Sequence, residues 1–132
     1  MLNDLEQRRI LVVEDEIFVA LDLAASVEDA NGTVIGPVGS VRQAMDLIDS
    51  HDVDAAILDV DLIDGNVEPV LERLKSANTF VVIHTGGGLP ARLAARYPGI
   101  PVFHKPIAPT VLTRTLASAF ASVSAGRAAD GA

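Results

Sequence analysis

The sequence predicts an open α/β domain with a parallel sheet and helices on both faces. Five short runs of aliphatic and β-branched residues alternate with five longer segments whose apolar residues recur at helical spacing. This alternation favours parallel strands joined by right-handed helical crossovers. Ligands of such sheets bind beyond the carboxyl ends of the strands, so the residues at those ends are the candidates for a functional site.

The five apolar runs predict the strands. They are expected at residues 10–13, 33–35, 55–60, 80–83 and 102–104. The third run is continuously apolar from Ala55 to Leu58, which indicates a central strand buried on both faces.

The helices are predicted from spacing and from capping residues. The first carries Ile17, Leu21, Ala24 and Val27 and stops at residues 31–32, Asn-Gly. Ser40 and Gln43 form a capping box for the second helix. The remaining helices are expected over residues 67–74, 90–97 and 109–123, with a loop at 61–65 before the third.

The chain length of 132 residues is that of one domain. We expect an N-terminal extension over residues 1–8, the folded domain over 9–123 and a flexible tail over 124–132. Hydrophobic residues make up 49% of the chain, enough for a packed core, and aromatic residues only 4%. The core must therefore consist mainly of aliphatic side chains.

Composition also excludes several classes of function. The net charge of −8 disfavours a nucleic-acid partner, because such binding rests on Lys and Arg contacts to phosphates. No apolar run approaches the roughly 20 residues that cross a bilayer, and the polar N-terminus is not a signal peptide. Cysteine is absent, which excludes disulfides and thiolate metal sites. We expect a cytoplasmic protein without membrane contact.

Charged and hydroxyl side chains follow the predicted strands. Glu14 and Asp15 follow the first strand, Asp59 the third, Thr85 the fourth and Lys105 the fifth. Carboxylates brought together repel one another, and Mg²⁺, which prefers oxygen ligands, relieves that repulsion. An aspartate can also act as a nucleophile toward phosphorus. The set therefore predicts magnesium-dependent phosphoryl transfer.

Each of these residues has an ordinary structural interpretation when taken alone. Acidic residues 14–16 suit a helix start, Asp59 and Asp61 suit a solvated turn, and Lys105 suits an exposed surface. The functional interpretation is favoured because all of them fall on one predicted edge of the sheet, in order.

These residues resemble the response-regulator receiver family over residues 9–123. The resemblance is carried by LVVEDE (11–16), AAILDVDL (55–62), Thr85 and FHKP (103–106). It implies a flavodoxin-like fold with strand order 2-1-3-4-5 and a cis bond before Pro106. It also implies site roles: Asp59 as phosphoacceptor and metal ligand, Asp15 as direct Mg²⁺ ligand, Glu14 as its outer-shell partner, the Asp61 backbone carbonyl as a further ligand, and Thr85, Gly86 and Lys105 as phosphate-binding and switch residues.

The sequence departs from the family pattern in three places. Val102 stands where an aromatic switch residue is common, the loop after Asp59 is short and lacks its usual proline, and Thr85 precedes three glycines at 86–88. These features resemble the FAT GUY branch in part. They predict that the loop at 86–88, rather than a threonine–aromatic pair, carries the conformational switch.

The resemblance implies protein partners. A histidine kinase or histidine phosphotransfer protein would supply the phosphoryl group, and an unknown downstream protein would receive the signal, or the domain would act as a phosphate sink. The face formed by residues 89–123 is a candidate for a homodimer contact. Both a stand-alone protein and a part of a larger one are compatible with the sequence. Turnover of external substrates is not expected.

Other interpretations remain open on the sequence. Asp59 and Asp61 could be the nucleophile and acid of a haloacid-dehalogenase-like phosphatase, although that motif normally follows the first strand. Glu14 with residues 59–61 could form a Toprim-like metal site, which the net charge disfavours. A receiver-like fold that never meets phosphate is a further alternative. His84 and His104 are expected to be partly buried near the output face rather than bound to a metal.

Overall fold

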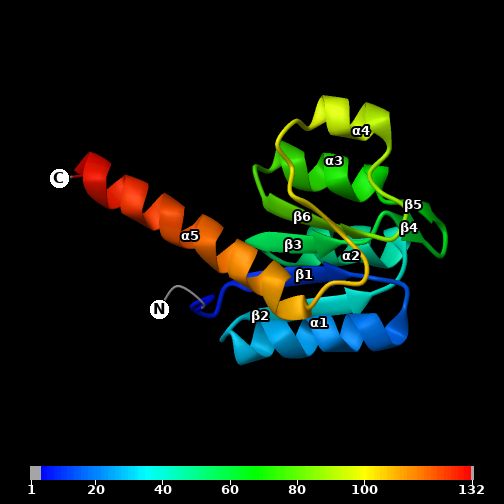
Figure 1. Cartoon of the computed structure of the whole chain (residues 1–132), viewed down its shortest axis with the longest axis horizontal. Helices are drawn as coiled ribbons and strands as arrows, with labels where there is room; N and C mark the ends of the chain where they lie inside the picture. Colours follow the sequence, from blue (N-terminus) through cyan, green and yellow to red (C-terminus); the bar gives the residue numbers. More distant parts are fainter. Residues whose placement is uncertain (1–3, 132) are drawn as a thin grey trace.

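The computed structural model describes residues 4–131, with side chains for residues 4–123. Its centre is a five-stranded parallel sheet in the order β2-β1-β3-β6-β7 (Figure 1). The strands are β1 (Arg9–Val13), β2 (Thr33–Val38), β3 (Ala55–Leu58), β6 (Phe80–Thr85) and β7 (Val102–His104). Because β4 and β5 lie outside this sheet, the order is the 2-1-3-4-5 order expected of the flavodoxin-like class. The predicted fold class is confirmed.

Helices cover both faces of the sheet (Figure 1). They are α1 (Ile17–Asp29), α2 (Val41–Ser50), α3 (Glu68–Ser76), α4 (Ala91–Arg96) and α5 (Pro109–Gly131). Helices α1 and α5 pack on one face and α2 and α3 on the other, as the two core clusters show. None of the helices in the described part of the chain is long and apolar enough to cross a lipid bilayer.

Alternation along the strands divides the core into two halves. In β1, Ile10 and Val12 face α1 and α5, whereas Leu11 and Val13 face α2 and α3. All four side chains are fully buried, which the continuous apolar runs predict for a parallel sheet covered on both faces. The same alternation decides which side chains at the strand ends can meet.

The segment after β3 differs from the loop that the sequence predicts. The short strands β4 (Asp61–Leu62) and β5 (Gly65–Asn66) form a small antiparallel hairpin. Its turn is closed by Gly65, whose φ of 142° is open to glycine and unfavourable for other residues. The buried side chain of Leu62 anchors the hairpin to the core.

Two helices also differ from expectation. The buried stripe of α1 is made by Ala20, Leu23, Ala24 and Val27, while Ile17 and Leu21 are exposed. Helix α5 continues through residues 124–131, past the predicted end at 123. The flexibility expected of residues 124–132 stays a prediction.

Candidate functional site

Backbone hydrogen bonds between neighbouring strands continue one residue past the sheet. They hold the candidate residues in position. The Glu14 amide donates to Val38 O, that of Asp59 to Val13 O and that of Lys105 to Thr85 O, each at 2.8 Å. Thr85 itself is the last residue of β6. The carboxyl ends of neighbouring parallel strands therefore hold these residues at one edge.

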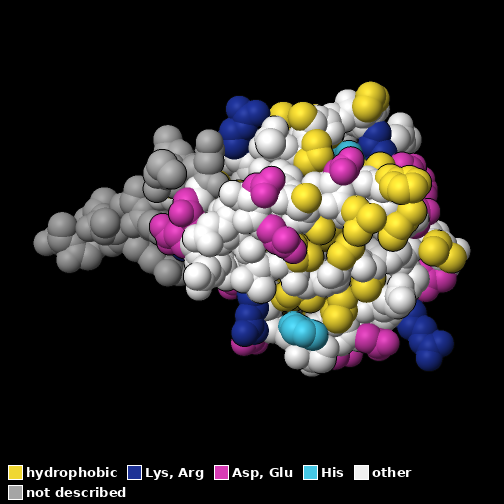
Figure 2. All heavy atoms as spheres, turned by 90° about the horizontal axis from the view of Figure 1, so that it is seen from below, with side chains coloured by type: hydrophobic (Ala, Val, Ile, Leu, Met, Phe, Trp, Pro, Cys, Tyr) yellow, Lys and Arg dark blue, Asp and Glu magenta, His cyan; other side chains and the backbone are white. Residues whose placement is uncertain are grey.

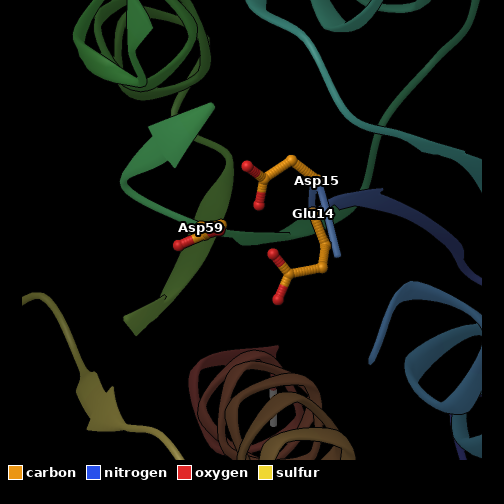
Figure 3. A group of neighbouring side chains, drawn as sticks. All are labelled: Glu14, Asp15 and Asp59. Carbon is orange, nitrogen blue, oxygen red and sulfur yellow. The ribbon is translucent and has the colours of Figure 1, made fainter. Parts of the chain in front are cut away.

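Three carboxylates meet at this edge. Glu14 and Asp15 extend from the end of β1 toward Asp59 at the end of β3 (Figure 3). One oxygen atom of each lies within 4.8 Å of the others. Glu14 and Asp59 are buried, whereas Asp15 is exposed at the mouth of the site. Such an all-oxygen set suits a small, hard cation.

The single cation among these carboxylates, in the described part of the chain, is Lys105. Its Nζ atom lies 2.7 Å from Glu14 Oε1, 3.4 Å from Asp59 Oδ2 and 3.6 Å from Glu16 Oε1. Burial alone would lower the pKa of Lys105, but Glu14, followed by Asp59 and Glu16, raises it. Lys105 is therefore charged and shared between the carboxylates.

One lysine does not neutralise the cluster. Burial, and next the neighbouring carboxylate of Glu14, raise the pKa of Asp59 from 3.8 to about 6, against the opposing charge of Lys105. Burial, and next the proximity of Asp59, also raise the pKa of Asp15. The Glu14 side chain is fully buried, and neither oxygen has hydrogen-bond geometry to a partner, although Oε1 contacts Lys105 as an ion pair. The site is short of positive charge.

Thr85 is buried beside the glycine loop. Its Oγ1 accepts hydrogen bonds from the Gly87 amide at 3.2 Å and the Gly88 amide at 3.1 Å. Gly86 is exposed and makes no close approach that would require a glycine. The hydroxyl is thus oriented by the loop, while its own proton has only a long contact of 3.5 Å to Gly88 O.

Asp64, which the sequence analysis missed, connects the β4–β5 hairpin to helix α2. Its carboxylate accepts from the Val41 amide at 2.7 Å and the Arg42 amide at 3.1 Å, at the N-terminus of α2. These backbone amides lower the pKa of Asp64. Ser40 also caps α2, as predicted, by accepting from Gln43. Asp61 lies in this hairpin with an exposed side chain.

The histidines do not lie where the sequence analysis expected them. His84 is only 3% exposed and lies on the site side, with Nδ1 3.9 Å from Glu14 Oε1. His104 is exposed. Partial burial was therefore the wrong expectation for both, since His84 is buried and His104 is exposed.

Apolar side chains gather on the surface near the same edge. Ile17, Phe18 and Leu21 at the start of α1 are 61%, 80% and 52% exposed, and Ile63 in the hairpin turn is 76% exposed. Figure 2 shows the face below the sheet in Figure 1, which carries α1, with hydrophobic side chains gathered toward one end. We call these four residues the apolar rim. Helical spacing alone could identify Ile17 and Leu21, but not their exposure.

Sheet order and the acidic edge together define a receiver-type fold, and known proteins agree with it. The solved structure of SdrG from Sphingomonas melonis Fr1 is 33% identical, has a TM-score of 0.70 and is matched over 95% of its length by 84% of this chain. The BeF3-activated conformation of SdrG from Pseudomonas melonis Fr1 is 34% identical, with a TM-score of 0.65, over 93% of that protein and 83% of this one. This chain belongs to the response-regulator receiver family, as a receiver domain of two-component signalling.

Two further similarities cover parts of longer proteins. The response regulator PhyR from Brucella abortus is 24% identical with a TM-score of 0.77, and 97% of this chain matches 54% of PhyR, which supports the fold. Transcriptional regulatory protein PdtaR of Mycobacterium tuberculosis (strain CDC 1551 / Oshkosh) is 34% identical over 53 residues, 40% of this chain and 26% of PdtaR. The chain thus spans about half of PhyR, and its match reaches about a quarter of PdtaR. No family model matches the chain.

Proposed function

We propose that this domain accepts a phosphoryl group on Asp59 from a phosphohistidine donor in a magnesium-dependent reaction. The observation that carries the proposal is the arrangement around Asp59. This residue ends the central strand, shares the edge with two further carboxylates and lies 3.4 Å from the ammonium group of Lys105. A nucleophile, a cation-binding set and a fixed positive charge are thus present together.

The residues present fit a magnesium ion. The buried oxygens of Glu14 lack hydrogen-bond partners, and the pKa values of Asp15 and Asp59 are raised, as expected of carboxylates that need a cation. Asp15, Asp59 and the Asp61 carbonyl would hold the ion, with Glu14 behind them. When bound, magnesium supplies positive charge for phosphate oxygens and keeps several waters.

The chain's own groups account for the transfer. A carboxylate oxygen of Asp59 forms the new bond to phosphorus, while the bond from phosphorus to the donor's imidazole nitrogen breaks and its electron pair stays on that nitrogen. Lys105 then pairs with a phosphoryl oxygen, and Thr85 donates its hydroxyl proton to another. Attack requires the ionised carboxylate of Asp59. Because the pKa of Asp59 is about 6, most of this carboxylate is ionised at neutral pH.

The donor must reach Asp59 across the rim of the site. The apolar rim, Ile17, Phe18, Leu21 and Ile63, offers exposed aliphatic and aromatic contacts at this entrance. Ile63 lies beside Gly39, which in turn approaches Asp15. We place the phosphohistidine-bearing helix of the kinase or phosphotransfer protein on this surface, because burying such side chains is the principal gain of a protein interface.

The downstream contact is assigned to the face formed by residues 89–123. It holds α4, β7 and the described start of α5, and it borders the Thr85–Gly88 loop. A second copy of the chain or another protein could occupy this face. Its use should depend on the phosphorylation state of Asp59.

Mass spectrometry tests the acceptor. The protein is incubated with magnesium and acetyl phosphate, and one acid-stable, base-labile phosphoryl group per chain is expected on Asp59. Asp59→Asn should abolish labelling. Asp61→Asn is the matched control, since its exposed carboxylate should not be needed, whereas a haloacid-dehalogenase-like phosphatase would need it. Full labelling of Asp59→Asn would refute the assignment.

Transfer kinetics test the docking surface. Phe18→Ser should slow transfer from a phosphorylated histidine phosphotransfer protein and leave labelling by acetyl phosphate unchanged. Val123→Ser is the matched control, because Val123 is also an exposed apolar residue, 53% exposed, and lies on α5. Equal transfer rates for parent and Phe18→Ser would place the donor elsewhere.

A further inference from the structure

His84 is a buried imidazole that no contact in the resting site explains. It is the penultimate residue of β6, its side chain is 4% exposed, and Nδ1 has no hydrogen-bond partner. Buried polar atoms are nearly always hydrogen-bonded in native proteins, so an orphan beside a functional site requires a reason.

Strand alternation directs His84 toward Glu14. Val82, two residues earlier in β6, faces the cluster under α1 and α5, as do Ile10 and Val12 of β1. His84 and Glu14 continue these two rows past the ends of the apolar core. Their closest polar atoms, Nδ1 and Oε1, are 3.9 Å apart, just beyond hydrogen-bond distance.

The same oxygen of Glu14 is already occupied by Lys105. Lys105 Nζ lies 2.7 Å from Oε1, so two nitrogen groups from different strands converge on one carboxylate oxygen. Burial, and next the charge of Lys105, lower the pKa of His84. The imidazole is therefore neutral and has one N–H to donate. Its Nδ1 atom has no hydrogen-bond partner.

Phosphorylation would change this balance. If Asp59 carries a phosphoryl group, as the proposed function requires, Lys105 has a more strongly charged partner there than a carboxylate. Glu14 would then lose its direct ion pair with Lys105, and both of its buried oxygens would lack a donor from the protein. A short rotation of the imidazole would bring Nδ1 within reach of Oε1.

We propose that His84 is a positioning residue that donates its Nδ1–H to Glu14 Oε1 when Lys105 turns to the phosphoryl group. In the resting protein its Nδ1 atom has no hydrogen-bond partner. In the phosphorylated protein it holds the Glu14 carboxylate in place, which stabilises the phosphorylated form relative to the resting one.

The effect of His84→Leu should therefore differ between the two states. In the resting protein the variant loses no hydrogen bond and replaces a buried orphan by an apolar group, so its melting temperature should be equal or higher. Its affinity for beryllofluoride with magnesium, measured by titration calorimetry, should fall by roughly tenfold, the loss expected for one hydrogen bond to a charged group. A purely structural role would not separate the two measurements.

Two variants and one resonance complete the test. His84→Asn can offer an amide N–H near the position of Nδ1 and should recover most of the affinity, while His51→Leu, exposed at the opposite edge, should have no effect. In the parent with ¹⁵N-labelled imidazoles, beryllofluoride with magnesium should produce a slowly exchanging Nδ1–H resonance that His84→Leu lacks. This signal needs no folded variant for its detection.

The outcomes are distinguishable. Failure of the parent to bind beryllofluoride would overturn the proposed function and the role of His84 together. Binding by the parent that is lost in Asp59→Asn but equally tight in His84→Leu would overturn only the role of His84. An Nδ1 resonance that beryllofluoride leaves unchanged would do the same.

Discussion

Removing the charge of Asp59 should stabilise the metal-free protein at neutral pH. Asp59 is 5% exposed, and burial followed by the proximity of Glu14 raises its pKa to about 6. The folded protein therefore holds an ionised carboxylate at pH 7 against a preference for the protonated form. Asp59→Asn has nearly the same shape and no charge, so it removes this unfavourable contribution.

The sign and size follow from the two pKa values. Because the folded pKa exceeds the ordinary value of 3.8, the native state binds more protons between these values, and stability falls as pH rises through about 6. A shift from 3.8 to about 6 corresponds to at most about 3 kcal/mol, at roughly 1.4 kcal/mol for each pH unit. Relative to the parent, Asp59→Asn should gain none of this free energy of unfolding near pH 4 and nearly all of it above pH 7.

Urea unfolding followed by circular dichroism, in EDTA and at several pH values, measures the effect. We expect the difference in unfolding free energy between Asp59→Asn and the parent to grow from near zero at pH 4 to roughly 1–3 kcal/mol at pH 7.5. A difference that stays constant from pH 4 to 7.5 would refute the reasoning.

Three further predictions concern the metal, the hairpin and the loop. Magnesium should raise the melting temperature of the parent, because at a hundred times its Kd it adds about 2.7 kcal/mol to the free energy of unfolding. Asp15→Asn should lose most of that rise. Asp64→Ala removes an acceptor shared by two amides of α2. It should therefore weaken magnesium binding in calorimetry more than Ser40→Ala. Beryllofluoride with magnesium should slow amide exchange across residues 85–97, and Gly87→Ala with Gly88→Ala should reduce that slowing.

Each of these has a clear contrary result. A melting curve that does not respond to millimolar magnesium would contradict the metal site. Equal magnesium affinity in Asp64→Ala and the parent would show that the hairpin does not depend on its tie to α2. Protection confined to Val102 and Phe103 would show that the switch lies in β7 instead of the glycine loop.

Sequence reasoning could place the acidic edge because it needs only the strand ends. Once Val13, Leu58, Ile83 and His104 are taken as the ends of parallel strands, the topology brings together the residues that come just after them, although β6 itself continues to Thr85. Hydrogen bonds that continue one residue past the strands, at Glu14, Asp59 and Lys105, keep that inference accurate to the residue.

The same reasoning could not find features that depend on distant parts of the chain. The apolar period of α1 includes Ile17, but the helix begins beside the site, so its first turn has no core to face and Ile17 is exposed. The contact of Asp64 with Val41 spans 23 residues and has no local pattern. The hairpin does have a local signal, the Asp64-Gly65 dipeptide typical of tight turns, which lies within the segment 61–65 that the sequence predicts as a loop.

We expect the proposed phosphorylation signal to pass through helix α4, a route that needs no aromatic residue at position 102. Leu93 is its single buried side chain among the described residues, and Arg92 and Arg96 tie it to Glu68 of α3 through exposed ion pairs, which stabilise little. Thr85 Oγ1 already accepts from the loop amides that precede α4, and a hydroxyl can go on accepting while it donates its proton. If Thr85 donates to a phosphoryl group on Asp59, as proposed, we expect its hydrogen-bonded loop to follow and the weakly held α4 to offer little resistance to that movement.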